Sequence, residues 1–578
     1  MASIIKKRKG NQVYYYAAQC QRVNGKPRIV WQKYLGKLED IVAKMSDHDV
    51  PKPYAAHVFQ FGAVAALYHI AQRLQLVDKI DRHAPKRAQG GTVGEYMLVA
   101  AINRAADPKS KRQIGEWFEG TALRRFLPHM NAKTLASQRF WDHMGYLDQK
   151  KIQAIEKDLT EHMVKVFDLD LQAVVYDATN FVSYIDTGSE SELAQRGNSK
   201  AKRHDLKQIS LALMVTMDYH IPLFHDVYPG NRPDAVQFAS VTEQLVERYK
   251  LLAKHCEHIT IVWDKGNNSK SNQQAFDAQA SYHVVGSLSP SQHLDLLAQA
   301  SVSFEPMKGE YIGHKAFRTR RLVMGKERTV VVVFNPARSL GQQQGLLTKL
   351  KKAEKALREL CKKLERRRVG EVKSGRAPTY ESIEKQVSDI LKDPEVRAVI
   401  QTKLTGGDIV PELVFEIDQQ SINAMVEQRF GKLILFSDNQ DWTNEEILAA
   451  YRGQFHIEDA FKQMKDPHFV GWSPMFHWTD SMIRVHAFYC VIALTLSSLL
   501  WREVCHQFTA ANKAEQAPKS IPALLESLEG IAEVAHIYPP QMNIQDHLTL
   551  SQMNQQQKTL FATLGLERFA PRCGNTPP

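Results

Sequence analysis

The sequence predicts an α/β fold, because short strand-like runs alternate with longer helical segments through its central part. Two of these runs, 172–176 and 258–263, are apolar, and each is followed directly by an aspartate, Asp177 and Asp264. Apolar runs of this length are typical of buried parallel strands. Open α/β sheets bind ligands at the carboxyl ends of such strands, so we expect the two aspartates to share a site.

The first 38 residues are strongly basic, with nine Lys or Arg and no Asp or Glu. Two β-type runs, 13–23 and 26–34, flank the pair Asn24-Gly25, which is a strong hairpin signal. Such a basic hairpin could bind the DNA backbone or serve as a small structural or oligomerisation element. The sequence leaves both interpretations open.

A helical region and then a series of strands are predicted after the hairpin. Residues 54–165 lack long strand-like runs, and their helices form either a helix-turn-helix or an ordinary helical packing. The helices are predicted at 92–106, 111–118 and 137–146. From about residue 168 the predicted order is β-β-β-α-β and one further strand, at 172–176, 208–217, 221–228, 235–254, 258–263 and 282–287. A loop at 190–205, rich in Ser, Lys and Arg, is either solvated or in contact with DNA.

A long insertion is predicted between Asp264 and the helix at 445–465. Within it, apolar side chains recur at spacings of four and three from Leu346 to Leu364, as in a heptad stripe. The surrounding stretch 349–376 holds twelve Lys or Arg against four Glu. Its helical hairpin contacts DNA or a partner subunit, or is simply an exposed charged element. The other predicted elements are strands at 328–334, 413–417 and 432–436 and a helix at 382–391.

The composition favours a protein with a polyanionic partner and argues against zinc-module, disulfide-rich and membrane-spanning classes. The chain has 578 residues and a net charge of +12, so a polyanionic partner is plausible. Six scattered cysteines without a Cys-x-x-Cys pair indicate neither a zinc module nor a disulfide framework, in keeping with a reducing cytoplasm. The apolar run 487–501 is too short for a typical membrane span, so we expect a buried core helix and no membrane. The last residues, 571–578, are expected to be disordered.

The helix predicted at 445–465 carries an unusual polar stripe. Tyr451, Glu458 and Lys465 are spaced seven apart, and Gln454 joins the same face. A capping box of Thr443 and Glu446 marks its start. By itself this stripe could belong to an ordinary amphipathic helix. Together with Asp177 and Asp264, Glu458 supplies the third carboxylate that a two-Mg²⁺ site requires. The apolar face is predicted to comprise Ile447, Ala450, Ile457, Phe461 and Met464.

These motifs resemble bacterial insertion-sequence transposases of the Asp-Asp-Glu (DDE) type, which have a ribonuclease-H-like core. The chain is most similar to the insertion-sequence-four-like subgroup, whose last acid lies in a Tyr-x2-Arg-x3-Glu-x6-Lys signature. Tyr451, Glu458 and Lys465 match that spacing, whereas Gln454 stands where the signature has Arg. The first two acids match within 176–180 and 263–267, and 228–232 resembles the Gly-Asn turn of these enzymes.

The resemblance implies an α/β fold with a ribonuclease-H-like catalytic core and a mixed β/helical insertion, preceded by a β-hairpin and a helical N-terminal region. The β-β-β-α-β order agrees with such a core. The implied units are a basic hairpin region at 1–50, a helical DNA-end-binding region at 51–165, core parts at 166–290 and 441–510, an insertion at 291–440, and a C-terminal region at 511–578.

The activity implied by the resemblance is DNA transposition, with metal-dependent cleavage at transposon ends and strand transfer into target DNA. Asp177, Asp264 and Glu458 would be the catalytic residues and would hold two Mg²⁺ ions, for which Mn²⁺ can substitute. The expected partners are double-stranded DNA and a second copy of the chain in a homodimer on that DNA, in the bacterial cytoplasm. The expected DNA-binding residues are Tyr451, Gln454, Lys465, Arg452 and Lys462.

Two other functions remain compatible with these residues. A structure-specific metal-dependent nuclease could use the same carboxylates without strand transfer. A DNA-binding regulator derived from a transposase would need no catalysis, but it should have lost at least one acid, and all three are present.

Overall fold

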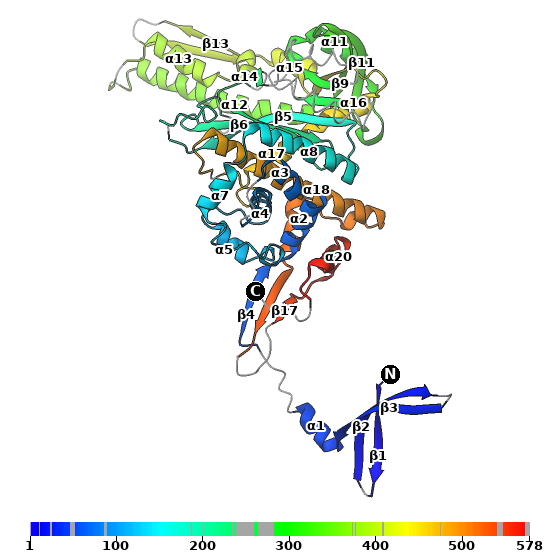
Figure 1. Cartoon of the computed structure of the whole chain (residues 1–578). Helices are drawn as coiled ribbons and strands as arrows, with labels where there is room; N and C mark the ends of the chain where they lie inside the picture. Colours follow the sequence, from blue (N-terminus) through cyan, green and yellow to red (C-terminus); the bar gives the residue numbers. More distant parts are fainter. Residues whose placement is uncertain are drawn as a thin grey trace. The chain divides into compact units, whose positions relative to one another are not determined.

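The chain folds into two compact units. Figure 1 shows its helices and strands, coloured along the sequence. The first unit combines Met1–Ala66, Glu116–Ala132 and Ala523–Pro578, and the second combines Leu67–Gly115 and Lys133–Pro522. The computed structural model describes residues 2–10, 12–23, 26–46, 53–85, 90–186, 188–199, 202–233, 236–237, 259–263, 282–372, 374–375, 377–406, 410–473, 475–539 and 547–572.

The first unit begins with a three-stranded antiparallel sheet in the order β1-β2-β3. The predicted hairpin is present as its second and third strands, while Asn24 and Gly25 lie outside the described residues. The first strand was not predicted from the sequence, and it pairs from Ala2↔Gln19 to Lys9↔Gln12. The elements are β1 (Ala2–Lys9), β2 (Gln12–Val23), β3 (Lys26–Gly36) and α1 (Leu38–Ser46).

A second sheet of the first unit joins distant parts of the chain. β4 (Ala55–Gln60) pairs with β16 (Ala532–Ile537), which also pairs with β17 (His547–Leu550). The prediction that 54–165 is helical throughout was therefore wrong at β4, a short strand whose pairing partner lies near the other end of the chain. Helices α6 (Leu123–Phe126) and α20 (Gln555–Thr563) also belong to this unit.

Helices make up the remainder of the N-terminal region, as predicted. Thr92 and Glu95 form a capping box at the start of α4, so this helix begins where the sequence indicated. α4 packs against α18 (Asp480–Ala510), which is long and apolar enough to cross a membrane. However, 89% of the most apolar window of α18 is buried inside the protein, which agrees with the predicted core helix. The helices of this region include α2 (Gly62–Arg73), α3 (Leu76–His83), α4 (Val93–Ala106), α5 (Ile114–Glu119), α7 (Ser137–Met144) and α8 (Gln149–Phe167). Helix α19 (Ile521–Glu529) follows α18 near the end of the chain.

The second unit is built on a nine-stranded mixed sheet in the order β10-β11-β12-β15-β9-β8-β5-β6-β7. β5, β8 and β9 run parallel to one another, and the other neighbours are antiparallel. The predicted helix 235–254 falls almost wholly outside the described residues. The core strands are β5 (Ala173–Ser183), β6 (Lys207–Thr216), β7 (Pro222–Pro229), β8 (Ile259–Trp263) and β9 (Tyr282–Leu288).

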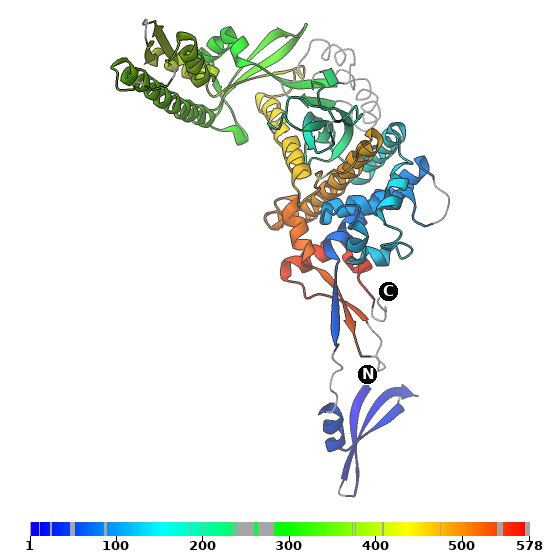
Figure 2. The same cartoon turned by 90° about the vertical axis from the view of Figure 1, so that its left-hand side faces the viewer.

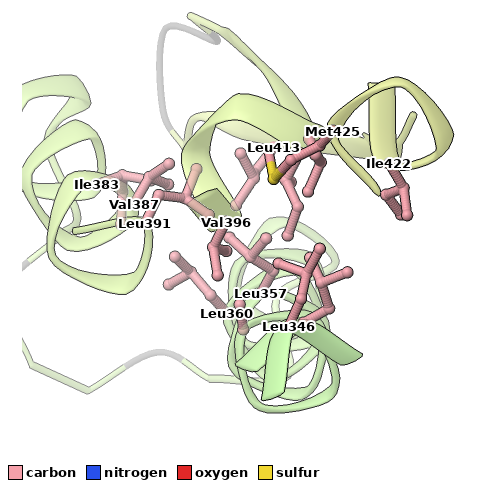
Figure 3. Close-up of a cluster of buried hydrophobic side chains, with 14 of the residues drawn as sticks. Leu346, Leu357, Leu360, Ile383, Val387, Leu391, Val396, Leu413, Ile422 and Met425 are labelled. Atoms are coloured by element: carbon pink, nitrogen blue, oxygen red, sulfur yellow. The ribbon is translucent and has the colours of Figure 1, made fainter. Parts of the chain in front are cut away.

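The predicted insertion divides between this sheet and a separate small core. β15 (Lys432–Ser437) pairs with β9, and through it β10 (Glu305–Pro306), β11 (Lys315–Val323) and β12 (Lys326–Phe334) extend the sheet. The heptad stripe of α12 (Pro336–Arg368) is buried and packs beside α13 (Tyr380–Ile390) and α14 (Pro394–Val399) (Figures 2 and 3). The remaining elements are α11 (Leu294–Val302), β13 (Ile400–Thr405), β14 (Glu412–Ile417) and α15 (Gln419–Arg429).

Candidate active site

Asp177 lies inside β5 rather than at its end. The sequence predicted that the strand would stop at 176, but β5 continues to Ser183 because β6 pairs with it along nearly its whole length. The half-buried Asp177 marks instead the point where pairing with β8 stops, since the last parallel pair is Tyr176↔Trp263. The predicted second acid, Asp264, follows Trp263 in the sequence and lies outside the described residues.

The helix predicted at 445–465 is interrupted near its middle. The structure has α16 (Asn444–Arg452) and α17 (Gln454–Lys465), separated by Gly453. A Cβ atom at Gly453 would overlap the side chain of Met217, so a close approach of the two segments occurs at this glycine. The prediction of one continuous helix was therefore wrong, because Tyr451 belongs to α16 whereas Gln454, Glu458 and Lys465 belong to α17.

The start and the packing face of this pair of helices agree with the sequence. Thr443 and Glu446 form the predicted capping box, and hydrogen bonds from the Thr443 backbone and hydroxyl lower the pKa of Glu446. The carboxylate therefore stays charged at the amino end of α16, where the helix dipole favours a negative charge. The predicted apolar face is buried throughout, at Ile447, Ala450, Ile457, Phe461 and Met464.

α17 packs against β5, the strand that carries Asp177 (Figure 1). Lys465 Nζ donates a hydrogen bond to Thr179 Oγ1 at 2.6 Å and lies 5.4 Å from the centre of the Phe181 ring. Thr179 is two residues beyond Asp177 on the same strand face, a spacing of about 7 Å. The structure thus brings the last lysine of the predicted signature close to the first predicted acid.

A groove of about 260 Å³ collects four of the other predicted residues: Tyr451, Arg452, Gln454 and Glu458. Glu458 is exposed, and Gln454 Nε2 is buried without a hydrogen-bond partner in the described part of the chain. A buried donor without an acceptor is costly, so an acceptor such as a phosphate oxygen would stabilise this site. Lys462 does not line the groove; it is exposed, 5.2 Å from the ring of Phe455.

Several residues that line the groove were not predicted as site residues, and two of them, His314 and Arg338, have basic side chains. His314 Nε2 lies 2.9 Å from Arg452 Nη2, and Tyr451 donates a hydrogen bond of 2.9 Å to Ser287 Oγ of β9. Arg338 lies in the first turn of α12, far from any recognisable motif in the sequence. Only the fold brings these residues beside α16 and α17.

The described residues contain no group of three or more His, Cys, Asp or Glu placed to hold a metal ion. Asp177 and Glu458 are hard oxygen donors of the kind that Mg²⁺ and Mn²⁺ prefer, but two carboxylates alone do not form such a group. The third predicted ligand, Asp264, is outside the described part, so the metal site stays a prediction.

No protein-family model and no curated protein matches the chain. Among solved structures it is similar to a piggyBac transposase synaptic complex with hairpin DNA, at 9% identity over 80% of this chain and 79% of that chain, with a TM-score of 0.34. It is also similar to the Mos1 transposase paired-end complex with the left transposon end, at 13% identity over 34% of this chain and 60% of that chain, with a TM-score of 0.14. A Mos1 mariner paired-end complex with Mn matches at 12% identity over 40% and 72%, also with a TM-score of 0.14. These neighbours are DNA transposases, but TM-scores this low establish neither the family nor the activity of this chain.

Proposed function

We propose that this chain is a DNA transposase of the DDE type, which cleaves the ends of a mobile element and joins them to target DNA. The observation that carries the proposal is the packing of α17 on β5, which sets Lys465 against Thr179, two residues from Asp177. An accidental motif match would not be expected to bring its first and last members onto contacting elements.

The arrangement of the core strands supports a ribonuclease-H-like core. β5 is flanked by β6 and then β7 on one side and by β8 and then β9 on the other, with β6 antiparallel and β8 parallel to β5. Tyr176 and Trp263, the residues just before Asp177 and Asp264, are paired across β5 and β8. This pairing supports the proposal that the two aspartates act at one site.

In the proposed mechanism, Asp177, Asp264 and Glu458 would hold two Mg²⁺ ions, and other residues of the chain would position the DNA. When bound, the metal pair supplies electrostatic stabilisation to the phosphate under attack and to the departing 3′-oxygen. Lys465 contributes a positive charge beside β5, and Gln454 and Arg452 donate hydrogen bonds to phosphate oxygens in the groove, where Tyr451 is held by its hydrogen bond to Ser287. No covalent link between protein and DNA is required.

The proposal is tested with the full chain and DNA that carries the element's ends, in Mg²⁺. Asp177→Ala, Asp264→Ala and Glu458→Ala should each abolish end cleavage and joining while keeping end binding, because each removes a charge that holds metal rather than a packing group. Full cleavage by any one variant would remove that residue from the site. Cleavage by the unaltered protein without joining to target DNA would indicate the nuclease instead of a transposase.

A further inference from the structure

A second cavity, of about 580 Å³, lies in the second unit and is separate from the groove beside α17. It is bounded by the helices α4, α7 and α18, which lie together in Figure 1, and by the segments 108–113 and 476–477. Its size falls within the range of about 300–1,000 Å³ that is usual for small-molecule sites. Among the described residues, none that lines the cavity is acidic, and Arg104, Lys111 and Arg112 contribute three basic side chains.

Two of these cations meet at one aromatic ring in the wall of the cavity. Lys111 Nζ donates a hydrogen bond of 2.8 Å to the Tyr489 hydroxyl, and Arg104 Cζ lies 6.0 Å from the centre of the same ring. Arg104 is only 5% exposed, and one of its guanidinium nitrogens donates a 2.5 Å hydrogen bond to the carbonyl oxygen of Gly471. Its Nε is buried without a hydrogen-bond partner in the described part of the chain.

The surroundings of these cations disfavour positive charge. Burial and the charge of Arg104 lower the pKa of Lys111 well below its usual value. Burial, with Lys111 and Arg104 nearby, also lowers the pKa of His477 to about 3. Within the described residues neither Arg104 nor Lys111 forms an ion pair with a carboxylate, so a bound anion would offset charge that the fold leaves uncompensated.

The rim of the cavity is aromatic. The side chains of Trp141 and Phe476 both line it and are 44% and 63% exposed. Exposed aromatic faces beside a cationic floor suit a ligand with a flat ring and an anionic group, because stacking and charge-assisted hydrogen bonds can act together. Stacking of a nucleic-acid base on an aromatic side chain strengthens binding by about tenfold or more.

We propose that this cavity binds a nucleotide, with its phosphate on Arg104 and Lys111 and its base against Trp141 and Phe476. The nucleotide is either free or part of a single strand, and the two sources share this chemistry. The site goes beyond the proposed transposase activity, since none of its residues belongs to the predicted catalytic set.

Binding is measured by titration calorimetry on the full-length protein with inorganic phosphate, a deoxynucleoside 5′-monophosphate and a short 5′-phosphorylated single strand. The monophosphate should bind at least about tenfold more tightly than inorganic phosphate, as expected for one stacked base. Tighter binding of the strand than of the monophosphate would identify a strand as the source, and equal binding would identify a free nucleotide.

Matched variants test the two halves of the cavity. Lys111→Met should weaken binding of the monophosphate and of inorganic phosphate by about tenfold or more, whereas Lys109→Met, two positions away and paired with Asp107 at 2.9 Å, should change neither. Trp141→Ala should weaken the monophosphate but not inorganic phosphate. Its control is Trp478→Ala, which removes an aromatic side chain that is 67% exposed and does not line the cavity.

Thermal unfolding confirms that each variant is folded before titration. Asp177→Ala should bind the monophosphate like the unaltered protein, which separates this site from the proposed metal site. The proposal is overturned if neither nucleotide ligand binds at millimolar concentration, or if folded Lys111→Met and Trp141→Ala both keep full affinity for the monophosphate.

Discussion

At the scale of single residues, Glu458 and Asp459 are adjacent carboxylates of α17 with different surroundings. Glu458 is exposed and lines the groove beside Tyr451. Asp459 instead accepts a hydrogen bond of 2.9 Å from Gln463 and lies 3.7 Å from His220 Nε2. Its contacts are those of a structural residue, which fits the rotation of about 100° between neighbours on a helix.

Glu458→Gln should therefore lower the rate of end cleavage by more than about 100-fold, as expected for a metal ligand whose outer partners alone contribute 10–100-fold. Asp459→Asn, the matched control, should keep cleavage within a few-fold, because its amide can still accept from Gln463. Both rates are measured in Mg²⁺ on the same end substrate. Equal losses in the two variants would show that the wrong carboxylate had been chosen.

His477 makes stability depend on pH. It is 6% exposed, and burial, Lys111 and Arg104 lower its pKa from 6.5 to about 3. A histidine whose folded-state pKa is depressed contributes stability above its unfolded pKa, and this contribution is lost as pH falls from 6.5 toward 3. His477→Gln should remove about 1 kcal/mol of the destabilisation between pH 6.5 and 5.5.

The measurement is denaturant unfolding at several pH values. His468→Gln is the control, because His468 is exposed and lies outside the cavity, and it should keep the original pH dependence. Buried His486, whose pKa is also lowered well below its usual value, remains in both variants, so part of the acid sensitivity should persist. An unchanged pH dependence in His477→Gln would contradict the assignment.

At the scale of elements, Gly453 lies between α16 and α17 at a point of close packing. A Cβ at this position would overlap Met217, which follows β6. Gly453→Ala should destabilise the protein by about 1–3 kcal/mol, as overpacking usually does. In a Met217→Ala background the same change should be neutral or stabilising by up to about 1 kcal/mol, because alanine favours helix over glycine. The stabilities of the unaltered protein, the two single variants and the double variant are compared by thermal unfolding. An equal effect of Gly453→Ala in both backgrounds would exclude the overlap with Met217 as the cause of the destabilisation.

The small hydrophobic core of the insertion is expected to unfold locally when one of its buried side chains is shortened. Leu357 on α12 is fully buried in that core, whereas Leu347 on the same helix is 52% exposed. Leu357→Ala should cost about 2–5 kcal/mol of local stability, and Leu347→Ala should cost little. Hydrogen exchange should accelerate in α12 and α14 but stay slow in β5 and β6. Accelerated exchange across the whole nine-stranded sheet would show that the insertion does not have its own cooperative core.

Elements that are determined by local sequence were predicted well, whereas elements that depend on distant contacts were not. β6, β7, β8 and β9 lie within a few residues of their predictions, because each is a locally apolar run between polar turns. The heptad stripe also predicted the buried face of α12, since helical periodicity is a local property. β5 extends past Asp177 because it pairs with β6, and residue 453 must lack a Cβ atom because Met217 lies against it. Neither cause can be read from the residues adjacent in sequence.

At the scale of the whole molecule, the first unit shows why long-range order escaped prediction. Its parts come from three separate stretches of the chain, and Ala55 pairs with Ile537. Glu533 is completely buried there and accepts hydrogen bonds from both Arg124, at 2.6 Å, and Arg125, at 2.6 and 2.8 Å. A buried carboxylate needs such partners, but nothing near 533 in the sequence identifies residues some 400 positions earlier. For the candidate site, the motif predicted that the helix with Glu458 and the strand with Asp177 would come together, and α17 does pack on β5. The positions of His314 and Arg338 in the groove could not be predicted, because only the tertiary fold brings them there.

If the protein acts on DNA as proposed, the distribution of positive charge indicates which parts of the chain contact the DNA backbone. The net charge is +12, and two regions of the sequence are rich in basic residues: the N-terminal segment and the stretch 349–376, which includes much of α12. Both were open to a DNA-binding or a purely structural interpretation. Lys6, Arg8 and Lys9 are exposed on β1, and Lys351, Lys352 and Lys355 are exposed on α12. Each set can be changed to Gln with the same loss of three charges. Lys7 is kept, because it donates a 3.0 Å hydrogen bond to Gln32 within the sheet.

Binding of end DNA is measured for both triple variants over a range of salt concentrations. Each lysine or arginine that contacts a phosphate contributes about 0.9 to the slope of log K against log salt. If the N-terminal sheet lies on DNA, the β1 variant should lose up to about three in this slope, while the α12 variant keeps it. Equal, small losses would reflect net charge alone and would leave both regions without a DNA contact. A loss confined to the α12 variant would transfer the contact to the insertion and leave the N-terminal sheet with a structural or oligomerisation role.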